Sequence, residues 1–121
     1  IILLYFLSVM GLIHKTLGDM RAAIDAGDWK ETLKILKEHS DPLVDKNMAA
    51  GLARAGNGAT EYVANINKIH DTLFAVRLGQ VEKPNNDQIA FIKKYLNEAE
   101  WGIKNFEEVV EKLLAEGKLQ Q

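Results

Sequence analysis

Three histidines are the side chains of this 121-residue chain best suited to bind a metal ion or a haem. His14, His39 and His70 fall in three different predicted helices, and helical bundles do assemble cofactor sites from facing helices. Their spacing argues against such a site, because the sequence contains no Glu-x-x-His, His-x-x-x-His or Cys-x-x-Cys-His motif. We therefore expect surface or boundary histidines and no bound cofactor or metal. The alternative is a bundle that binds a metal, a haem or a small ligand through these histidines.

Two acidic pairs near the C-terminus are the next candidates for chemistry. Glu98 lies close to Glu100, and Glu107 is adjacent to Glu108. A carboxyl group acts as a general acid or base when burial moves its pKa. All four residues lie off the apolar stripe of their predicted helix, so they should be solvated. The chain also lacks cysteine and any Gly-x-x-x-x-Gly-Lys phosphate loop. We predict that the protein is not an enzyme.

Aromatic side chains outside the apolar stripe of the last helix favour a binding role. Phe91 and Tyr95 lie off the stripe, and Trp101 falls on the opposite side of the helix. Tryptophan is enriched at protein interfaces because it buries a large area with few rotatable bonds. Either a partner protein contacts Trp101, or another helix of the same chain covers it. Trp29, in contrast, lies on an apolar stripe and is predicted to be in the core.

The first thirteen residues are apolar apart from Ser8 and Gly11. A helix that is apolar on all sides must be covered on all sides, so this segment should face a partner subunit or lipid. Thirteen residues are too few to cross a bilayer, which takes about 20. The segment is compatible with the end of a longer hydrophobic stretch. We treat residues 1–14 as an apolar helical segment continuous with the first helix, and residues 15–121 as the bundle domain.

Apolar residues at alternating spacings of three and four predict the helices that position these groups. The stripe of the first helix is Leu3, Phe6, Met10, Ile13, Leu17, Met20 and Ile24, and that of the last is Ile89, Ile92, Leu96, Ala99, Ile103, Phe106, Val110 and Leu113. A second helix begins after Asp28, with a kink or restart at Pro42, and a third spans residues 59–78. Pairing of Asp28 with Glu31 and of Asn85 with Gln88 predicts capping boxes. The expected fold is all-α, an up-and-down bundle of about four helices.

The composition and net charge of the chain limit the kinds of partner that it can bind. A chain of 121 residues that is 47% hydrophobic and 26% charged is expected to form one globular domain. Its 15 basic and 17 acidic residues give a net charge of −2, so there is no overall positive field to hold nucleic acid.

One stretch of sequence resembles a known family. The segment Ala26-Gly27-Asp28-Trp29 precedes a leucine-rich helix, and a long final helix covers residues 89–113. Over residues 15–119 this layout resembles the PsbQ-like extrinsic subunits of photosystem II. The resemblance implies a non-catalytic four-helix bundle at the lumenal face of the thylakoid membrane, where it supports the oxygen-evolving site. It transfers no functional residue to this chain.

These observations predict a non-catalytic accessory subunit of a larger, membrane-associated complex. It would contact protein subunits, and a membrane through residues 1–13, and would not bind nucleic acid. The expected contact residues are Leu4, Tyr5, Leu7, Leu12, Phe91, Tyr95 and Trp101. Besides a histidine-liganded bundle, the alternative is a membrane-tethered helical interaction domain whose anchor precedes Ile1.

Overall fold

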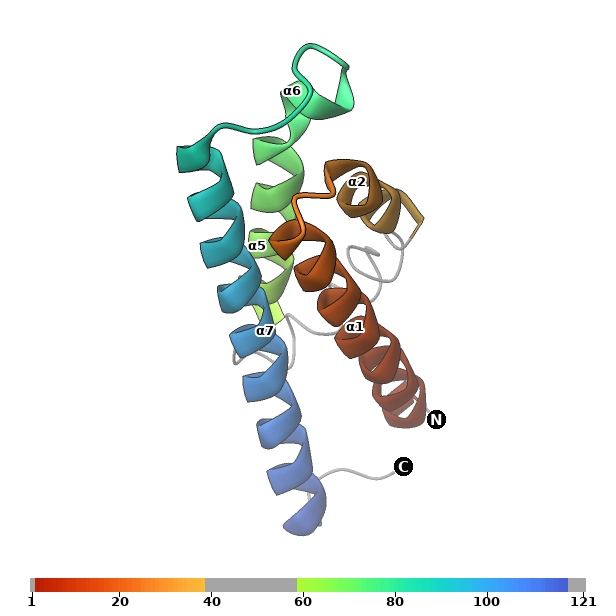
Figure 1. The fold of residues 1–121 in the computed structure, drawn as a ribbon. Helices are drawn as coiled ribbons and strands as arrows, with labels where there is room; N and C mark the ends of the chain where they lie inside the picture. Colours follow the sequence, from red (N-terminus) through yellow and green to blue (C-terminus); the bar gives the residue numbers. More distant parts are fainter. Residues whose placement is uncertain (1, 39–58, 118–121) are drawn as a thin grey trace.

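The computed structural model describes residues 2–38 and 59–117, except for the side chains of residues 2–10, 38, 59–60, 63, 110 and 113–114. These ranges contain helices and connecting turns and no strand (Figure 1). The helices are α1 (Ile2–Asp25), α2 (Trp29–Glu38), α5 (Ala59–Thr72), α6 (Phe74–Arg77) and α7 (Asn86–Ala115). The all-α prediction is confirmed. The predicted kink or restart at Pro42 lies outside the described residues.

A glycine and a capping aspartate separate α1 from α2. Gly27 adopts a positive φ of 69°, which costs glycine little because it has no Cβ. The amide of Gly27 donates to the carbonyl of Ile24 at 3.0 Å, and the amide of Asp28 donates to that of Ala23 at 2.9 Å. This pair of bonds is a Schellman motif. The carboxylate of Asp28 then accepts the amide of Glu31 at 3.1 Å, which is one half of the predicted capping box. The amide of Asp28 donates to Ala23 and not to the Glu31 side chain, so the other half does not form.

The third predicted helix is interrupted. The expectation of one helix over residues 59–78 is wrong, because α5 ends at Thr72 and the four-residue α6 follows after Leu73. The Thr72 hydroxyl donates to the Lys68 carbonyl at 2.7 Å, and this type of bond from a threonine to the preceding turn often bends a helix. Phe74 and Leu78, two apolar residues in the last part of that predicted helix, are 52% and 54% exposed.

The long helix α7 begins at the second predicted capping box. The amide of Asn85 donates to the Gln88 side chain at 2.9 Å, and the amide of Gln88 donates to the Asn85 side chain at 2.8 Å. These two backbone amides at the start of α7 have no carbonyl partner within the helix, and side chains satisfy both of them. With 30 residues, α7 is about 45 Å long.

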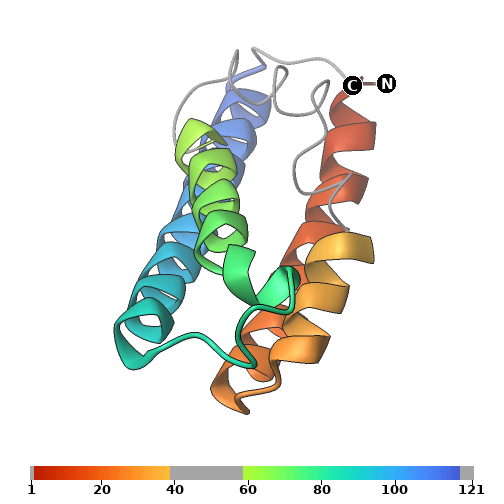
Figure 2. The same cartoon turned by 90° about the horizontal axis from the view of Figure 1, so that it is seen from above.

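Two helix pairs make up the described part of the molecule. Helices α5 and α7 pack against each other and run in opposite directions in Figure 1. Helix α1 packs on α7 and on the short α2. Viewed from the end in Figure 2, α5 with α7 and α1 with α2 lie as neighbouring pairs.

The hydrophobic core lies where these helices meet. Every stripe residue of α1 and α7 with a described side chain is buried, apart from the partly buried Ile89. Trp29 is 7% exposed and belongs to this core, as predicted. The remaining core residues of α2 and α5, with the residue that follows α5, are Ile35, Leu36, Tyr62, Ile66, Ile69 and Leu73. Burying each large aliphatic side chain contributes about 2 kcal/mol, so the stripes fix which helix faces turn inward.

Candidate functional site

Trp101 presents its ring to solvent on the outer side of α7. Trp101 is 58% exposed, and no helix within the described residues covers it. The neighbouring Gly102 and Ile103 are buried. Trp101 also lines a shallow depression of about 150 Å³ with Lys104, Asn105 and Glu108. An exposed indole beside polar groups is the combination that protein interfaces use as an anchor.

The other two predicted aromatics of α7 form a separate cluster. Phe91 is 51% exposed, and its ring stacks on that of Tyr95 with centroids 6.1 Å apart. The Lys68 ammonium group of α5 lies 5.5 Å from the centroid of the Tyr95 ring, within range of a cation–π interaction. Trp101 follows Phe91 by ten residues, about 15 Å along the helix axis. The structure brings Phe91 and Tyr95 together and leaves Trp101 apart from them.

The N-terminal contact residues are described only in part. Leu12 is 39% exposed, as expected for a residue outside the buried stripe. The side chains of Leu4, Tyr5 and Leu7 lie outside the described part of the chain. Among the helices of the described ranges, none has the length and apolar character needed to cross a membrane.

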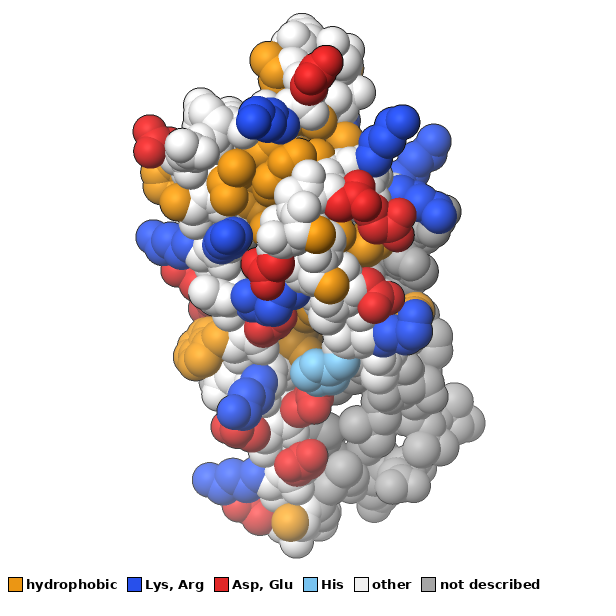
Figure 3. Space-filling view, in the orientation of Figure 1, with side chains coloured by type: hydrophobic (Ala, Val, Ile, Leu, Met, Phe, Trp, Pro, Cys, Tyr) orange, Lys and Arg blue, Asp and Glu red, His pale blue; other side chains and the backbone are white. Residues whose placement is uncertain are grey.

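Polar pairs join α1 to α7, and two of them use residues that were candidates for chemistry. Arg21 donates through Nε and Nη2 to the two carboxylate oxygens of Glu100, at 3.1 and 2.8 Å. Its Nη2 also donates to the Asn97 side chain at 2.6 Å. His14 contacts Glu107. Figure 3 shows basic and acidic side chains interspersed over this face, with a histidine among them.

These pairs correct the expectation that the acidic residues of α7 are solvated, and they bear on whether the histidines could bind a metal ion. Glu100 and Glu107 were expected to be solvated, but their side chains are only 38% and 28% exposed because each lies against a cationic or imidazole group of α1. Glu108 is exposed, as expected. The described residues contain no group of three His, Cys, Asp or Glu side chains able to hold a metal ion. His39 lies outside those residues.

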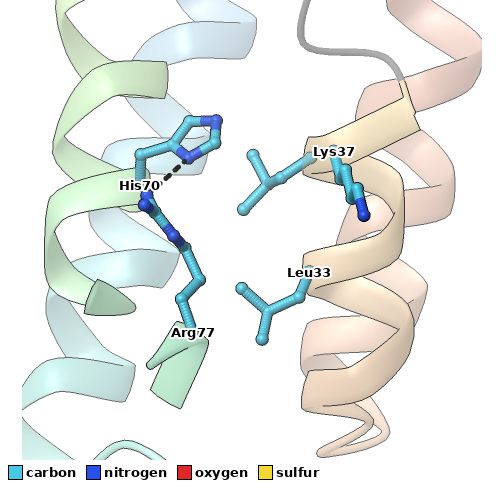
Figure 4. A pocket seen from close by; sticks show the side chains of 5 residues that line it. Leu33, Lys37, His70 and Arg77 are labelled. Atoms are coloured by element: carbon cyan, nitrogen blue, oxygen red, sulfur yellow. Dashed lines mark hydrogen bonds between the residues drawn. The ribbon is translucent and has the colours of Figure 1, made fainter. Parts of the chain in front are cut away.

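A cleft of about 470 Å³ separates α2 from α5 and α6. Figure 4 shows Leu33 and Lys37 of α2 facing His70 of α5 and Arg77 of α6 across it. Leu36 completes the described lining. Arg77 extends along the wall, and its Nη1 lies 3.4 Å from the His70 Nδ1. Burial lowers the pKa of His70, and the nearby charge of Arg77 lowers it further, whereas Asp71 acts in the opposite direction.

No family model matches this chain, and neither a curated protein nor a solved structure does.

Sequence reasoning missed the cleft. His70 was considered as a metal ligand or a boundary residue, and Arg77 was placed within a continuous third helix. The interruption at Leu73 moves Arg77 onto a separate short helix, where its guanidinium reaches His70. Arg77 follows His70 by seven residues, a spacing that brings side chains to one face of a helix. That spacing was the one available sequence clue.

Proposed function

We propose that this chain is a non-catalytic accessory subunit that binds another protein through the outer face of α7. The observation that carries the proposal is the exposed indole of Trp101, 58% accessible on the side of α7 away from the core. The stacked Phe91 and Tyr95 rings offer a second aromatic contact on the same helix. Tyr95 also packs against the core, whereas Trp101 and Phe91 are more than half exposed, and large exposed aromatics are typical of binding hot spots.

In this proposal the domain is an up-and-down bundle of four helices, with α1, α2, α5 and α7 as its members. The opposite directions of α5 and α7 support this arrangement (Figure 1), as does the packing of α1 on α7. The rigid core holds α7 in place, so the protein presents a preformed aromatic face. A preformed surface loses little conformational entropy on binding.

The larger complex is proposed to be membrane-associated, with residues 1–13 as a second contact. Its support is the apolar sequence of that segment and the 39% exposure of Leu12. The more specific proposal, an extrinsic protein of photosystem II at the thylakoid lumenal face, rests on the resemblance carried by the segment around Asp28 and Trp29 and by the long final helix. A salt wash of native membranes followed by native-gel separation tests it. Co-migration with a pigment–protein complex before the wash, and release by salt, is the expected result.

The protein-binding proposal is tested with Trp101→Ala in the full chain. A hot-spot tryptophan contributes about 2 kcal/mol or more to binding, roughly thirtyfold in affinity. We expect Trp101→Ala to abolish co-migration of the chain with its complex on native gels while far-UV circular dichroism stays unchanged. Leu78→Ala is the matched control, since Leu78 is 54% exposed but lies outside α7. Unchanged co-migration of a Trp101→Ala, Phe91→Ala double variant would refute the proposal.

A further inference from the structure

The cleft between α2 and the α5–α6 segment has two chemically different walls. On the α2 side, the partly buried Leu33 provides the accessible aliphatic surface, and the buried Leu36 borders the cleft. On the other side lie the His70 imidazole and the Arg77 guanidinium (Figure 4). A volume of about 470 Å³ is in the range of sites that take small organic molecules.

The polar groups of this cleft are hydrogen-bond donors. A guanidinium has donors only, so in its contact with Arg77 the His70 Nδ1 must be the acceptor. The proton of the neutral imidazole then sits on Nε2, and Figure 4 shows this second ring nitrogen directed toward the α2 side of the cleft. No Asp or Glu is among the lining residues in the described part of the chain.

The charge of this wall, like its hydrogen-bond donors, suits an anionic group. Burial and the positive charge of Arg77 both lower the pKa of His70, which reports a partly dry and electropositive wall. Among the described residues Arg77 has no carboxylate partner; its guanidinium lies 5.7 Å from the centroid of the Phe74 ring and next to His70. A planar guanidinium binds carboxylates through two parallel hydrogen bonds.

We propose that this cleft binds a small amphipathic carboxylate, with its head group on Arg77 and His70 and its aliphatic chain along Leu33. The carboxylate accepts hydrogen bonds from the guanidinium and from the His70 Nε2 proton. The chain covers Leu33 on the facing wall. This ligand site is independent of the protein contact proposed for α7.

Octanoate is the probe, and isothermal titration calorimetry of the full chain with NMR mapping is the measurement. Saturable binding of one octanoate per chain is expected, with shifts at Leu33, Leu36 and His70. Charge-assisted hydrogen bonds of this kind correspond to roughly tenfold to hundredfold in affinity, so Arg77→Gln should weaken binding by that factor. Leu33→Asn should also weaken it at least tenfold, because it removes part of the aliphatic wall. Lys104→Gln, an exposed cation of α7 outside this cleft, is the matched control.

Three ligand comparisons separate the proposal from its competitors. Octanol and octylammonium share the chain but lack the acceptor charge, and both should bind at least tenfold more weakly. Inorganic phosphate shares the charge but lacks the chain. Phosphate binding as tight as that of octanoate and insensitive to Leu33→Asn would identify a simple anion site and overturn the proposal.

Absence of saturable octanoate binding, or equal binding by the wild type and Arg77→Gln, would also overturn it. If Arg77→Gln loses its helical circular dichroism, Arg77→Lys keeps the charge without the planar fork and should show an intermediate loss. Trp101→Ala should bind octanoate like the wild type. Failure of the proposed protein contact is thereby distinguishable from failure of this site.

Discussion

Replacing Tyr62 by phenylalanine should stabilise the protein. Tyr62 is fully buried in α5, and its hydroxyl oxygen has no hydrogen-bond partner among the described residues. An unsatisfied buried polar group costs about 1–3 kcal/mol. Phenylalanine keeps the ring and removes the group, and the small void left behind costs up to about 1 kcal/mol. The net expectation is a gain of about 1 kcal/mol, equivalent to a rise of roughly 4 °C in Tm for a domain of this size.

Urea denaturation followed by far-UV circular dichroism measures this gain. Tyr95→Phe makes the same chemical change on a half-exposed ring, and it should alter the free energy of unfolding by less than about 0.5 kcal/mol. Burial also raises the pKa of Tyr62 above its ordinary value of 10.0. Above pH 10.0 the unfolded tyrosine ionises and the folded one does not, so the wild type loses stability there. The advantage of Tyr62→Phe should therefore widen. A loss of about 1 kcal/mol or more in Tyr62→Phe at neutral pH would refute the reasoning, because it would show that the hydroxyl has a partner.

Three further changes test the local interactions described above. In a double-mutant cycle, Arg21→Gln and Glu100→Gln should show a coupling of about 1 kcal/mol, the upper end for a partly exposed pair with two-pronged geometry. Coupling unaffected by about 1 M NaCl would contradict an electrostatic origin. Gly27→Ala should lower the free energy of unfolding by about 1 kcal/mol because φ is 69° there. Gly18→Ala, inside α1 with open space where a Cβ would lie, should raise it by about 0.8 kcal/mol. Changes of the same sign in urea denaturation would refute this. Because burial lowers the pKa of His70 below 6.5, the unfolded state binds more protons and stability falls as pH drops below 6.5. His70→Gln should reduce that pH slope, and an unchanged slope would refute the assigned shift.

Local sequence patterns predicted the features that local physics determines. A stripe with spacings of three and four identifies the buried side of α1 and α7 without reference to any other helix, and Leu17 and Leu96 are each 1% exposed as a result. The capping box at Asn85 and Gln88 involves atoms only three residues apart. Such interactions form within one turn, so the sequence contains all the information they need.

The prediction of one helix over residues 59–78 was wrong for a reason that is also local, but that the spacing of apolar residues does not reveal. Its apolar residues continue with helical spacing through Leu78, and the pattern therefore predicted one helix. The break falls at Leu73, whose φ is −92° and ψ is 10°, directly after Thr72, whose hydroxyl donates to the Lys68 carbonyl. Hydrophobic periodicity does not encode a change of backbone angles at one residue. The consequence reaches the candidate ligand site, since Arg77 belongs to the segment beyond the break.

The polar pairs between α1 and α7 depend on how the two helices are aligned along their axes. The sequence of either helix alone does not reveal that alignment. His14 contacts Glu107 and Arg21 binds Glu100, so a step of seven residues forward along α1 is a step of seven residues back along α7. Two antiparallel helices with heptad stripes place flanking positions opposite one another in this way. Once these two helices are known to be antiparallel neighbours, the seven-residue spacing of His14 and Arg21 and that of Glu100 and Glu107 become mutually consistent. In this register the carboxylates of Glu100 and Glu107 each contact a side chain of α1, whereas the exposed ring of Trp101 lies on the side of α7 away from the core.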